Sequence, residues 1–259
     1  MSAALAAAYE RDGFCLHSGA VVPTDVLSAA QASMAAVRDG TFDTGRPPSS
    51  HPGYDPAVLC KINDAHLAGR GLYDLVCHPA FGKLAAQVTG ARQVQLWASQ
   101  LLIKPPASGE QGHVGWHQDR QYWRYWQEPE GLFTMWVALS DVTESSGPIR
   151  FVCGSQRWGY LDEGDFFGRD LAAQRQRITV PPEESWEEVS GLLDAGGVSF
   201  HHCLTYHASG QNTSSSPRCS LAVHLRTEQA RPVVGDDNYY VSHLDDAVYS
   251  PVLYGASTT

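Results

Sequence analysis

The stretch Val94-Gln95-Leu96-Trp97-Ala98-Ser99-Gln100-Leu101-Leu102-Ile103 marks the point at which the sequence changes from a helical to a β pattern. It is long and rich in apolar residues, which is typical of a buried strand. Helices are predicted before it, at residues 2–11, 23–37, 66–77 and 79–89, with a short strand at 14–16. Strands are predicted after it, at residues 133–140, 148–153, 196–202 and 219–226. Helices followed by many strands predict one α+β domain with a barrel or a sandwich at its centre.

Two further segments carry no clear helical or strand pattern. Residues 39–56 contain Gly, Pro, Ser and His51 and predict a long irregular loop. Loops of this length inside a compact domain are usually functional lids or disordered segments. Residues 156–190 are polar and charged, and we interpret them as an insertion with little core.

Composition excludes several classes of partner. The chain has 259 residues and a formal net charge of -10, from 28 acidic and 18 basic side chains. This acidic balance argues against nucleic acid and against an anionic membrane, because both require basic patches. We therefore expect a small-molecule partner, while the oligomeric state is left open.

Cysteine usage and the N-terminal sequence indicate a cytoplasmic protein. The six cysteines contain no Cys-x-x-Cys pair, so we interpret them as free thiols in a reducing compartment. The N-terminus lacks the basic region of a signal peptide. No apolar run reaches the roughly 18 residues that a transmembrane helix needs.

A His-x-Asp pair, His117 and Asp119, follows the long strand. On a strand, positions i and i+2 point to the same face, so both side chains are expected to converge. His207 is the candidate for a third ligand. Two His and one carboxylate on one side of a metal ion form the facial triad of non-haem Fe(II) oxygenases. Arg218, with Ser220 two residues later, supplies the forked donor and the hydroxyl that a dicarboxylate co-substrate such as 2-oxoglutarate requires.

The arrangement of these motifs resembles the phytanoyl-CoA dioxygenase family of Fe(II)/2-oxoglutarate oxygenases over roughly residues 8 to 228. The matching blocks, in the family's order and with similar spacing, are Asp12–Phe14, Leu101–Pro106, Trp116–Asp119, Trp136–Leu139, Ser146–Ser155, and His207–Asn212 with Arg218. The chain departs from the family at Cys153-Gly154-Ser155-Gln156, where the family often has Pro-Gly-Ser-His. That His is not a metal ligand in the family, so the departure leaves the proposed triad intact.

The resemblance implies a double-stranded β-helix, the jelly-roll core of cupin-like oxygenases, with flanking helices. The core is expected at roughly 92–228, after an N-terminal helical part at 1–91, within a single domain spanning residues 1–259. Fe(II), 2-oxoglutarate and O2 are the implied cofactor and co-substrates. Contacts with 2-oxoglutarate are implied for Arg218, Ser220, Gln100, Lys61 and Trp136. Taken alone, Lys61 also fits a solvated surface charge and Trp136 a core residue.

Two neighbouring histidines precede His207. Alternation along the predicted strand places His201 and His202 on opposite faces. We expect His202 to hold a metal ligand in place by a hydrogen bond. His201 is expected to be packed or exposed elsewhere.

An aromatic segment directly follows the His-x-Asp pair. We interpret Arg120, Tyr122, Trp123 and Trp126 as a substrate wall, in which the aromatics cover an apolar skeleton and Arg120 meets an anionic group. The same residues fit a loop packed against the barrel rim. If the first interpretation holds, substrate binds between this segment and a lid at 39–56.

The predicted function is hydroxylation of a small organic molecule, such as a secondary metabolite in natural product biosynthesis, with release of succinate and CO2. Asp119 argues against a halogenase, which needs a small residue at that position so that chloride can occupy it. Two alternatives remain. A zinc hydrolase also uses two His and a carboxylate but needs no Arg218. A non-catalytic small-molecule binder on a cupin-like barrel would tolerate loss of the triad.

Overall fold

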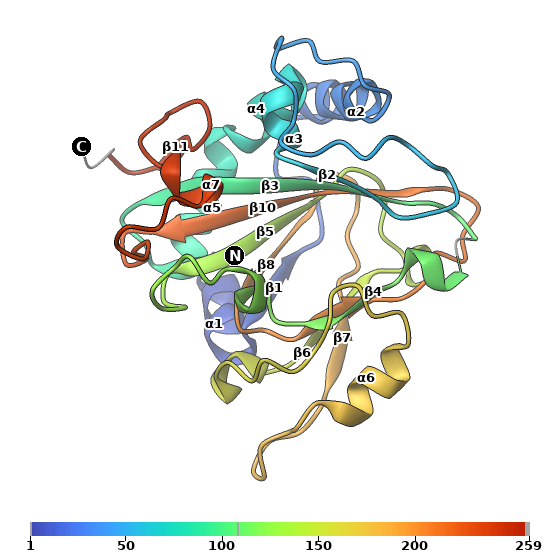
Figure 1. Cartoon of the computed structure of the whole chain (residues 1–259), viewed down its shortest axis with the longest axis vertical. Coiled ribbons are helices and arrows are strands. Elements are labelled where there is room, and N and C mark those ends of the chain that lie inside the picture. The colour runs from blue at the N-terminus through green and yellow to red at the C-terminus, as the bar shows by residue number, and fades with distance from the viewer. Residues whose placement is uncertain (1, 108, 257–259) are drawn as a thin grey trace.

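Two antiparallel sheets form the centre of the protein, as Figure 1 shows for the computed structural model, which describes residues 2–107 and 109–256. The larger sheet has seven strands. In spatial order they are β1 (Phe14–His17), β8 (Val198–His202), β5 (Leu132–Ala138), β10 (Arg218–Thr227), β3 (Val94–Lys104) and β11 (Val252–Tyr254), with β2 (Cys60–Asn63) also paired to β3. The smaller sheet has four strands, β4 (Val114–His117), β9 (His207–Ser209), β6 (Ile149–Val152) and β7 (Glu188–Ser190). This is the predicted α+β jelly roll.

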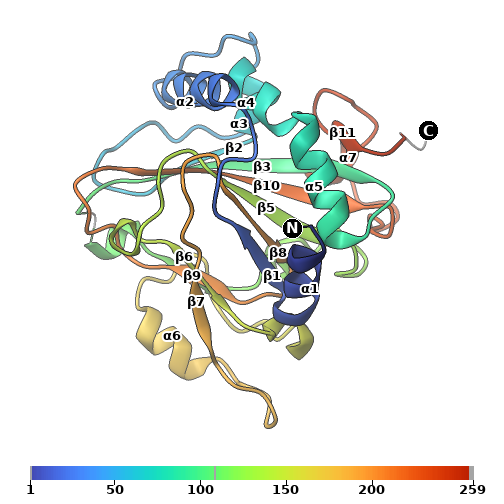
Figure 2. The same cartoon turned by 180° about the vertical axis from the view of Figure 1, so that it is seen from behind.

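Helices cover the outer face of the larger sheet, as the view from behind shows (Figure 2). They are α1 (Ser2–Asp12), α2 (Thr24–Arg38), α3 (Ala65–Ala68), α4 (Arg70–Val76) and α5 (Pro79–Thr89). Two short helices lie elsewhere, α6 (Leu171–Arg177) and α7 (Tyr239–Ser242). Four 3-10 helices complete the described elements: η1 (Gly109–Gly112), η2 (Asp119–Tyr122), η3 (Glu144–Ser146) and η4 (Ser155–Trp158).

Side chains along β10 alternate between the two faces of the larger sheet. Leu221, Val223 and Leu225 point outward and join the buried core beneath the helices. Each such side chain, fully buried, stabilises the fold by about 1.5–3 kcal/mol. The residues between them face the smaller sheet, where Ala222 packs in a second buried cluster with Phe151. The inner faces of the two sheets therefore enclose the space available for a site.

Two segments differ from the sequence-based prediction. The helix predicted at 66–77 is split into α3 and α4, because Gly69 between them adopts an extended conformation (φ -126°, ψ 120°). The polar insertion at 156–190 has a small core of its own, in which Trp158 and Ile178 pack with Trp116. No residue of α6 is buried, as expected for that part of the insertion.

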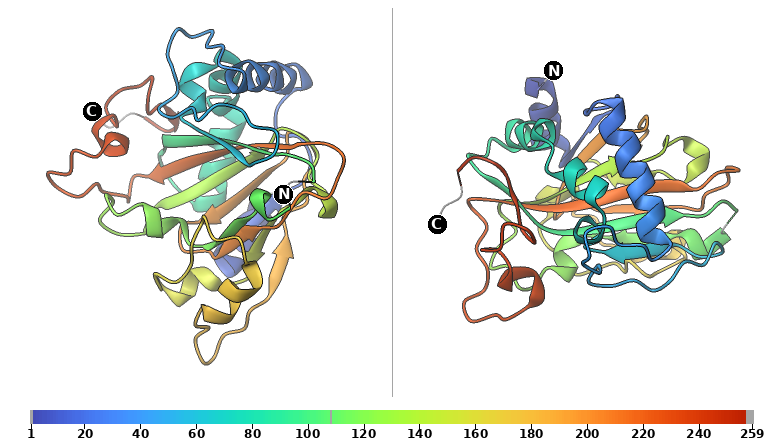
Figure 3. Two further views of the ribbon diagram at one scale, coloured as in Figure 1. Left: turned by 45° about the vertical axis from the view of Figure 1, so that its right-hand side comes forward. Right: turned by 90° about the horizontal axis from the view of Figure 1, so that it is seen from above.

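The chain after β10 folds back along one end of the larger sheet (Figure 3). Its strand β11 pairs with β3, and α7 lies against the same strand. This segment is outside the stretch predicted as the jelly-roll core, yet it reaches the site. Within residues 2–107 and 109–256, no helix combines the length and the apolar character needed to cross a membrane.

Candidate metal centre and adjoining cavities

His117, Asp119 and His207 converge between the two sheets. The Nε2 atom of His117 lies 3.6 Å from Oδ1 of Asp119, and the Nε2 atom of His207 lies 3.7 Å from the same oxygen. One ligand atom from each residue falls within 4.8 Å of the other two, and all three residues are buried. The structure thus brings the predicted triad together.

The two histidines are aligned by strand pairing. His117 is the last residue of β4 and pairs with His207, the first residue of β9. Asp119, by contrast, lies outside the strand, as the first residue of η2. The strand-alternation argument for His117 and Asp119 is therefore wrong, although the two side chains do meet.

Gln118 holds the turn that returns Asp119 to the site. Its buried amide donates to the carbonyls of Gly159 (2.8 Å) and Leu204 (2.7 Å), and its oxygen accepts from the Leu161 amide (3.1 Å). The conformation of the turn is thus set by contacts with two distant segments, which the local sequence does not reveal.

Backbone carbonyls fix the orientation of both imidazoles. The Nδ1 atom of His117 lies 2.8 Å from the Gly115 oxygen, and that of His207 lies 2.9 Å from the Thr205 oxygen. A carbonyl only accepts, so each Nδ1 carries a proton, and Nε2 is the ring nitrogen directed at the site. Burial and the neighbouring imidazoles lower the pKa of His207 well below its ordinary value. Neutral imidazoles with a free Nε2 are the form that binds a metal ion.

The second oxygen of Asp119 is held separately from the first. Thr134 donates its hydroxyl proton to Oδ2 (2.7 Å), and the Nε2 atom of His201 lies 3.3 Å from the same oxygen. Burial alone would raise the pKa of Asp119, but the surrounding imidazoles and their hydrogen bonds lower it well below the usual range. Asp119 is therefore an ionised carboxylate whose Oδ1 remains directed at the two histidines.

The structure reverses the expected positions of His201 and His202. Val198 and Phe200 pack beneath the helices, so the alternate residue His201 faces the site, with its ring 4.4 Å from that of His207. The ring of His202 does not face the site, and its Nδ1 accepts the Leu204 amide (3.1 Å). Which of the two histidines faces the site depends on which face of the sheet the helices cover. The alternation of residues along the strand does not show this.

A narrow inner cavity of about 40 Å³ leads from the triad to Arg218. Arg218 is only 1% exposed, and its Nε has no hydrogen-bond partner among the described residues. One guanidinium nitrogen donates to the Gly147 carbonyl (2.8 Å), and the group lies 5.1 Å from the centre of the Trp136 ring. Burial lowers the pKa of Arg218 to about 10. A buried cation without an anionic partner is costly, so this cavity favours an anionic ligand.

The remaining residues predicted to contact a co-substrate fall in different places. Trp136 lines the inner cavity, and Gln100 lines both cavities. Lys61 lines the outer cavity, with its ammonium 4.4 Å from the centre of the Phe166 ring. Ser220 lines neither, because its hydroxyl donates to the Leu102 carbonyl (3.3 Å) of the adjacent strand.

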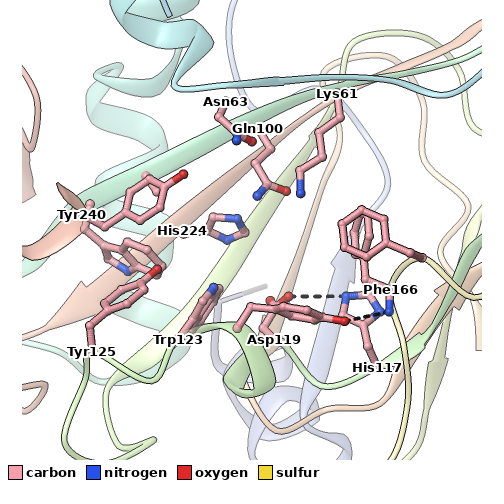
Figure 4. Close-up of a pocket in the computed structure, with 14 residues that line it drawn as sticks. Lys61, Asn63, Gln100, His117, Asp119, Trp123, Tyr125, Phe166, His224 and Tyr240 are labelled. Carbon is pink, nitrogen blue, oxygen red and sulfur yellow. Dashed lines mark hydrogen bonds and ion pairs between the residues drawn. The ribbon is translucent and has the colours of Figure 1, made fainter. Parts of the chain in front are cut away.

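A larger outer cavity of about 190 Å³ opens on the other side of the triad (Figure 4). Tyr240, Tyr125 and Trp123 line one side of it, and Phe166 lies across from them, next to the Lys61 ammonium. The lining residues are Lys61, Asn63, Trp97, Ala98, Gln100, His117, Asp119, Tyr122, Trp123, Tyr125, Phe166, Phe167, His224 and Tyr240. The inner and outer cavities share His117 and Asp119, so both open onto the candidate metal position.

Only part of the predicted substrate wall reaches a cavity. Tyr122 and Trp123 line the outer cavity. Arg120 does not, because its guanidinium donates to the carbonyls of Trp123 and Gln127 within its own loop. Trp126 does not either: it is fully buried and packs against Trp97, with ring centres 5.7 Å apart.

The cavity walls also contain residues that sequence reasoning did not assign. Phe166 and Phe167 come from the polar insertion, and Tyr240 comes from the segment after β10. Phe166 lies 5.1 Å from the His117 ring, because the Gly115 amide bonds to the Phe166 carbonyl (3.0 Å). No residue of 39–56 lines either of the two cavities. The aromatic pair Phe166-Phe167 in a polar stretch was the available signal.

Comparisons with known proteins agree with this geometry. The chain matches the family model described as phytanoyl-CoA dioxygenase (PhyH) over residues 9–220. An ectoine dioxygenase of Bordetella parapertussis is 28% identical over 237 residues, which cover 85% of this chain and 74% of that protein.

Two solved structures are also similar to this chain. The alpha ketoglutarate dependent carbocyclase SnoK from nogalamycin biosynthesis is 25% identical, with a TM-score of 0.72 over 94% of this chain and 91% of that one. The epimerase SnoN, in complex with Fe3+, alpha ketoglutarate and nogalamycin RO, is 25% identical, with a TM-score of 0.70 over 89% and 85% of the two chains.

The different positions of Trp126 and Tyr122 predict different effects on stability. Trp126→Ala is expected to lower the free energy of unfolding by about 3–5 kcal/mol, because it removes a large, fully buried side chain. Tyr122→Ala, at a residue that is 40% exposed, is expected to cost less than half as much. Urea denaturation of both variants measures this difference. Equal losses would contradict the assignment of Trp126 to the core.

Proposed function

The chain belongs to the phytanoyl-CoA dioxygenase family of iron- and 2-oxoglutarate-dependent oxygenases, and from that premise we propose that it hydroxylates a small organic molecule beside His117, Asp119 and His207. The proposal rests on the convergence of three ligand atoms. The Nε2 atoms of His117 and His207 both lie within 3.7 Å of Oδ1 of Asp119. Succinate and CO2 are the accompanying products.

The donor set fits a divalent iron ion. Each imidazole has its Nδ1 bonded to a backbone carbonyl and its Nε2 directed at the site, and Asp119 contributes a carboxylate oxygen, so two nitrogens and one oxygen face a common point. Two histidines and one carboxylate leave the other coordination positions open. When bound there, iron supplies the activation of O2, coupled to oxidative decarboxylation of 2-oxoglutarate to succinate.

The inner cavity is the proposed place of 2-oxoglutarate. It is lined by Arg218, whose forked guanidinium suits the distal carboxylate of the co-substrate. Trp136 provides the wall against which the guanidinium lies, and Gln100 stands where the inner and outer cavities join. Lys61 approaches from the outer cavity and adds positive charge on the metal side of the co-substrate.

The outer cavity is the proposed place of the substrate. Its volume of about 190 Å³ suits a compact molecule, and Trp123 and Tyr122 offer apolar contact beside the triad. Phe166 and Tyr240 add aromatic surface to the same cavity, which suits a strong oxidant because an apolar lining limits its side reactions. A small secondary metabolite fits these features.

Succinate formation tests the proposed function. Purified protein with Fe(II) and 2-oxoglutarate in air is expected to release succinate, and Zn(II) is expected to suppress the release. Asp119→Ala should abolish it without unfolding the protein, because the variant loses the anionic ligand. His17→Ala is a control at a histidine that lines neither of the two cavities and should keep the wild-type rate. Full succinate formation by Asp119→Ala, or hydrolysis supported by Zn(II) without 2-oxoglutarate, would contradict the proposal.

Replacement of Arg218 is expected to weaken the binding of the co-substrate without affecting the binding of the metal ion. Arg218→Ala should weaken 2-oxoglutarate binding by about 2–5 kcal/mol, because it leaves the distal carboxylate without its partner. Arg218→Lys should recover part of this loss, since it restores the charge without the fork. Calorimetry on the anaerobic Mn(II) form measures both affinities, and Mn(II) binding itself should persist. Arg226→Ala, on the same strand but outside both cavities, is the control. Unaltered 2-oxoglutarate affinity in Arg218→Ala would exclude this anchoring role.

A further inference from the structure

A hydrogen-bond chain links Asp119 to His224 at the floor of the outer cavity. The Thr134 hydroxyl lies 2.7 Å from Oδ2 of Asp119 and 2.9 Å from Nδ1 of His224. The hydroxyl has one proton, which it donates to the Asp119 oxygen, so that proton is not available to His224. The hydroxyl therefore accepts from Nδ1 of His224, which must carry a proton.

The same hydrogen-bond chain determines whether Nε2 of His224 carries a proton. His224 is neutral, because burial lowers its pKa to about 4. A neutral imidazole has one proton, and with that proton on Nδ1, Nε2 is left as a bare acceptor. Sequence reasoning assigned no role to His224, since its partner Thr134 lies on a different strand.

The bare nitrogen is available to a ligand. His224 lines both cavities, and Figure 4 shows its ring on the cavity lining between Gln100 and Trp123. Its Nε2 makes no hydrogen bond to any residue that the structure describes. The ring is stacked on Trp97 (5.4 Å, 28°) and meets the Trp123 ring at 67° (4.9 Å), so packing opposes its rotation.

We propose that His224 is a specificity-determining residue, whose Nε2 accepts a hydrogen bond from an N–H or O–H group of the substrate. The substrate class is a compact, mainly apolar ring compound that carries such a donor close to the carbon to be oxidised. This inference rests on the proposed function, because it places the substrate in the outer cavity.

Discrimination follows from the fixed tautomer. A substrate that turns a carbonyl, ether or carboxylate oxygen toward Nε2 would place two acceptors against each other at a buried ring. Sites built to bond one hydrogen-bonding group reject analogues that lack it, because a buried polar atom is then left unpaired. A substrate with an N–H or O–H at this point is therefore preferred over its N- or O-methylated analogue.

Nitrogen NMR of the histidine side chains tests the tautomer without turnover. The Zn(II) form with 2-oxoglutarate is labelled with 15N-histidine, and the His224 signals are identified by their absence in His224→Phe. Wild type is expected to show a protonated Nδ1 and a bare Nε2. Thr134→Val removes the acceptor and should shift His224 toward the other tautomer. A protonated Nε2 in wild type, or no response to Thr134→Val in a folded protein, overturns the inference.

A matched pair of lactams tests recognition. In the same sample, 2-pyrrolidinone should shift the Nε2 signal and bind at least about fivefold more tightly than N-methyl-2-pyrrolidinone, the loss expected from one hydrogen bond of about 1 kcal/mol. His224→Asn places an amide only at the Nδ1 position and should remove the preference, whereas His224→Gln, which reaches the Nε2 position, should keep part of it.

Failure of the inference is distinguishable from failure of the proposed function. Absent or equal responses to the two lactams overturn the role of His224. Succinate release with Fe(II) and 2-oxoglutarate is measured separately and does not depend on either lactam.

Discussion

One buried carboxylate sets the conditions for the rest of this structure. Asp119 is ionised between two sheets, where an unpaired negative charge is strongly unfavourable. Its Oδ2 is stabilised by the Thr134 hydroxyl and lies close to His201. Its Oδ1 faces the Nε2 atoms of His117 and His207, whose Nδ1 atoms are bonded to backbone carbonyls. A bound cation would satisfy all three groups at once, which explains why ionisable residues are tolerated in an otherwise apolar interior.

The fold places positive and negative groups at opposite ends of the inner cavity. Arg218 begins β10, and the inward-facing positions that follow lead toward the metal centre through Ala222 to His224. A dicarboxylate bound to a metal ion at one end can meet a cation at the other, and the spacing along this strand supports the proposed position of 2-oxoglutarate. The outer cavity, where we propose that the substrate binds, shares His117 and Asp119 with the inner one.

The sequence predicted the jelly roll and the three converging side chains because their motifs are local and their order is informative. It did not predict what depends on tertiary contacts. Asp119 leaves the strand because Gln118 bonds to two distant segments, and His201 rather than His202 faces the site because helices cover the other face. Phe166 and Tyr240 reach the cavity from segments with no periodic pattern, and the aromatic pair at 166–167 was the one local signal for the first of them.

The most direct test of this account is a diffraction measurement on crystals grown without oxygen in the presence of Mn(II) and 2-oxoglutarate. Anomalous scattering locates the metal ion independently of any model of its ligands. We expect one Mn(II) bound by His117, Asp119 and His207, with 2-oxoglutarate in the inner cavity and its distal carboxylate on Arg218. A metal ion bound elsewhere, or a co-substrate bound away from Arg218, would contradict it.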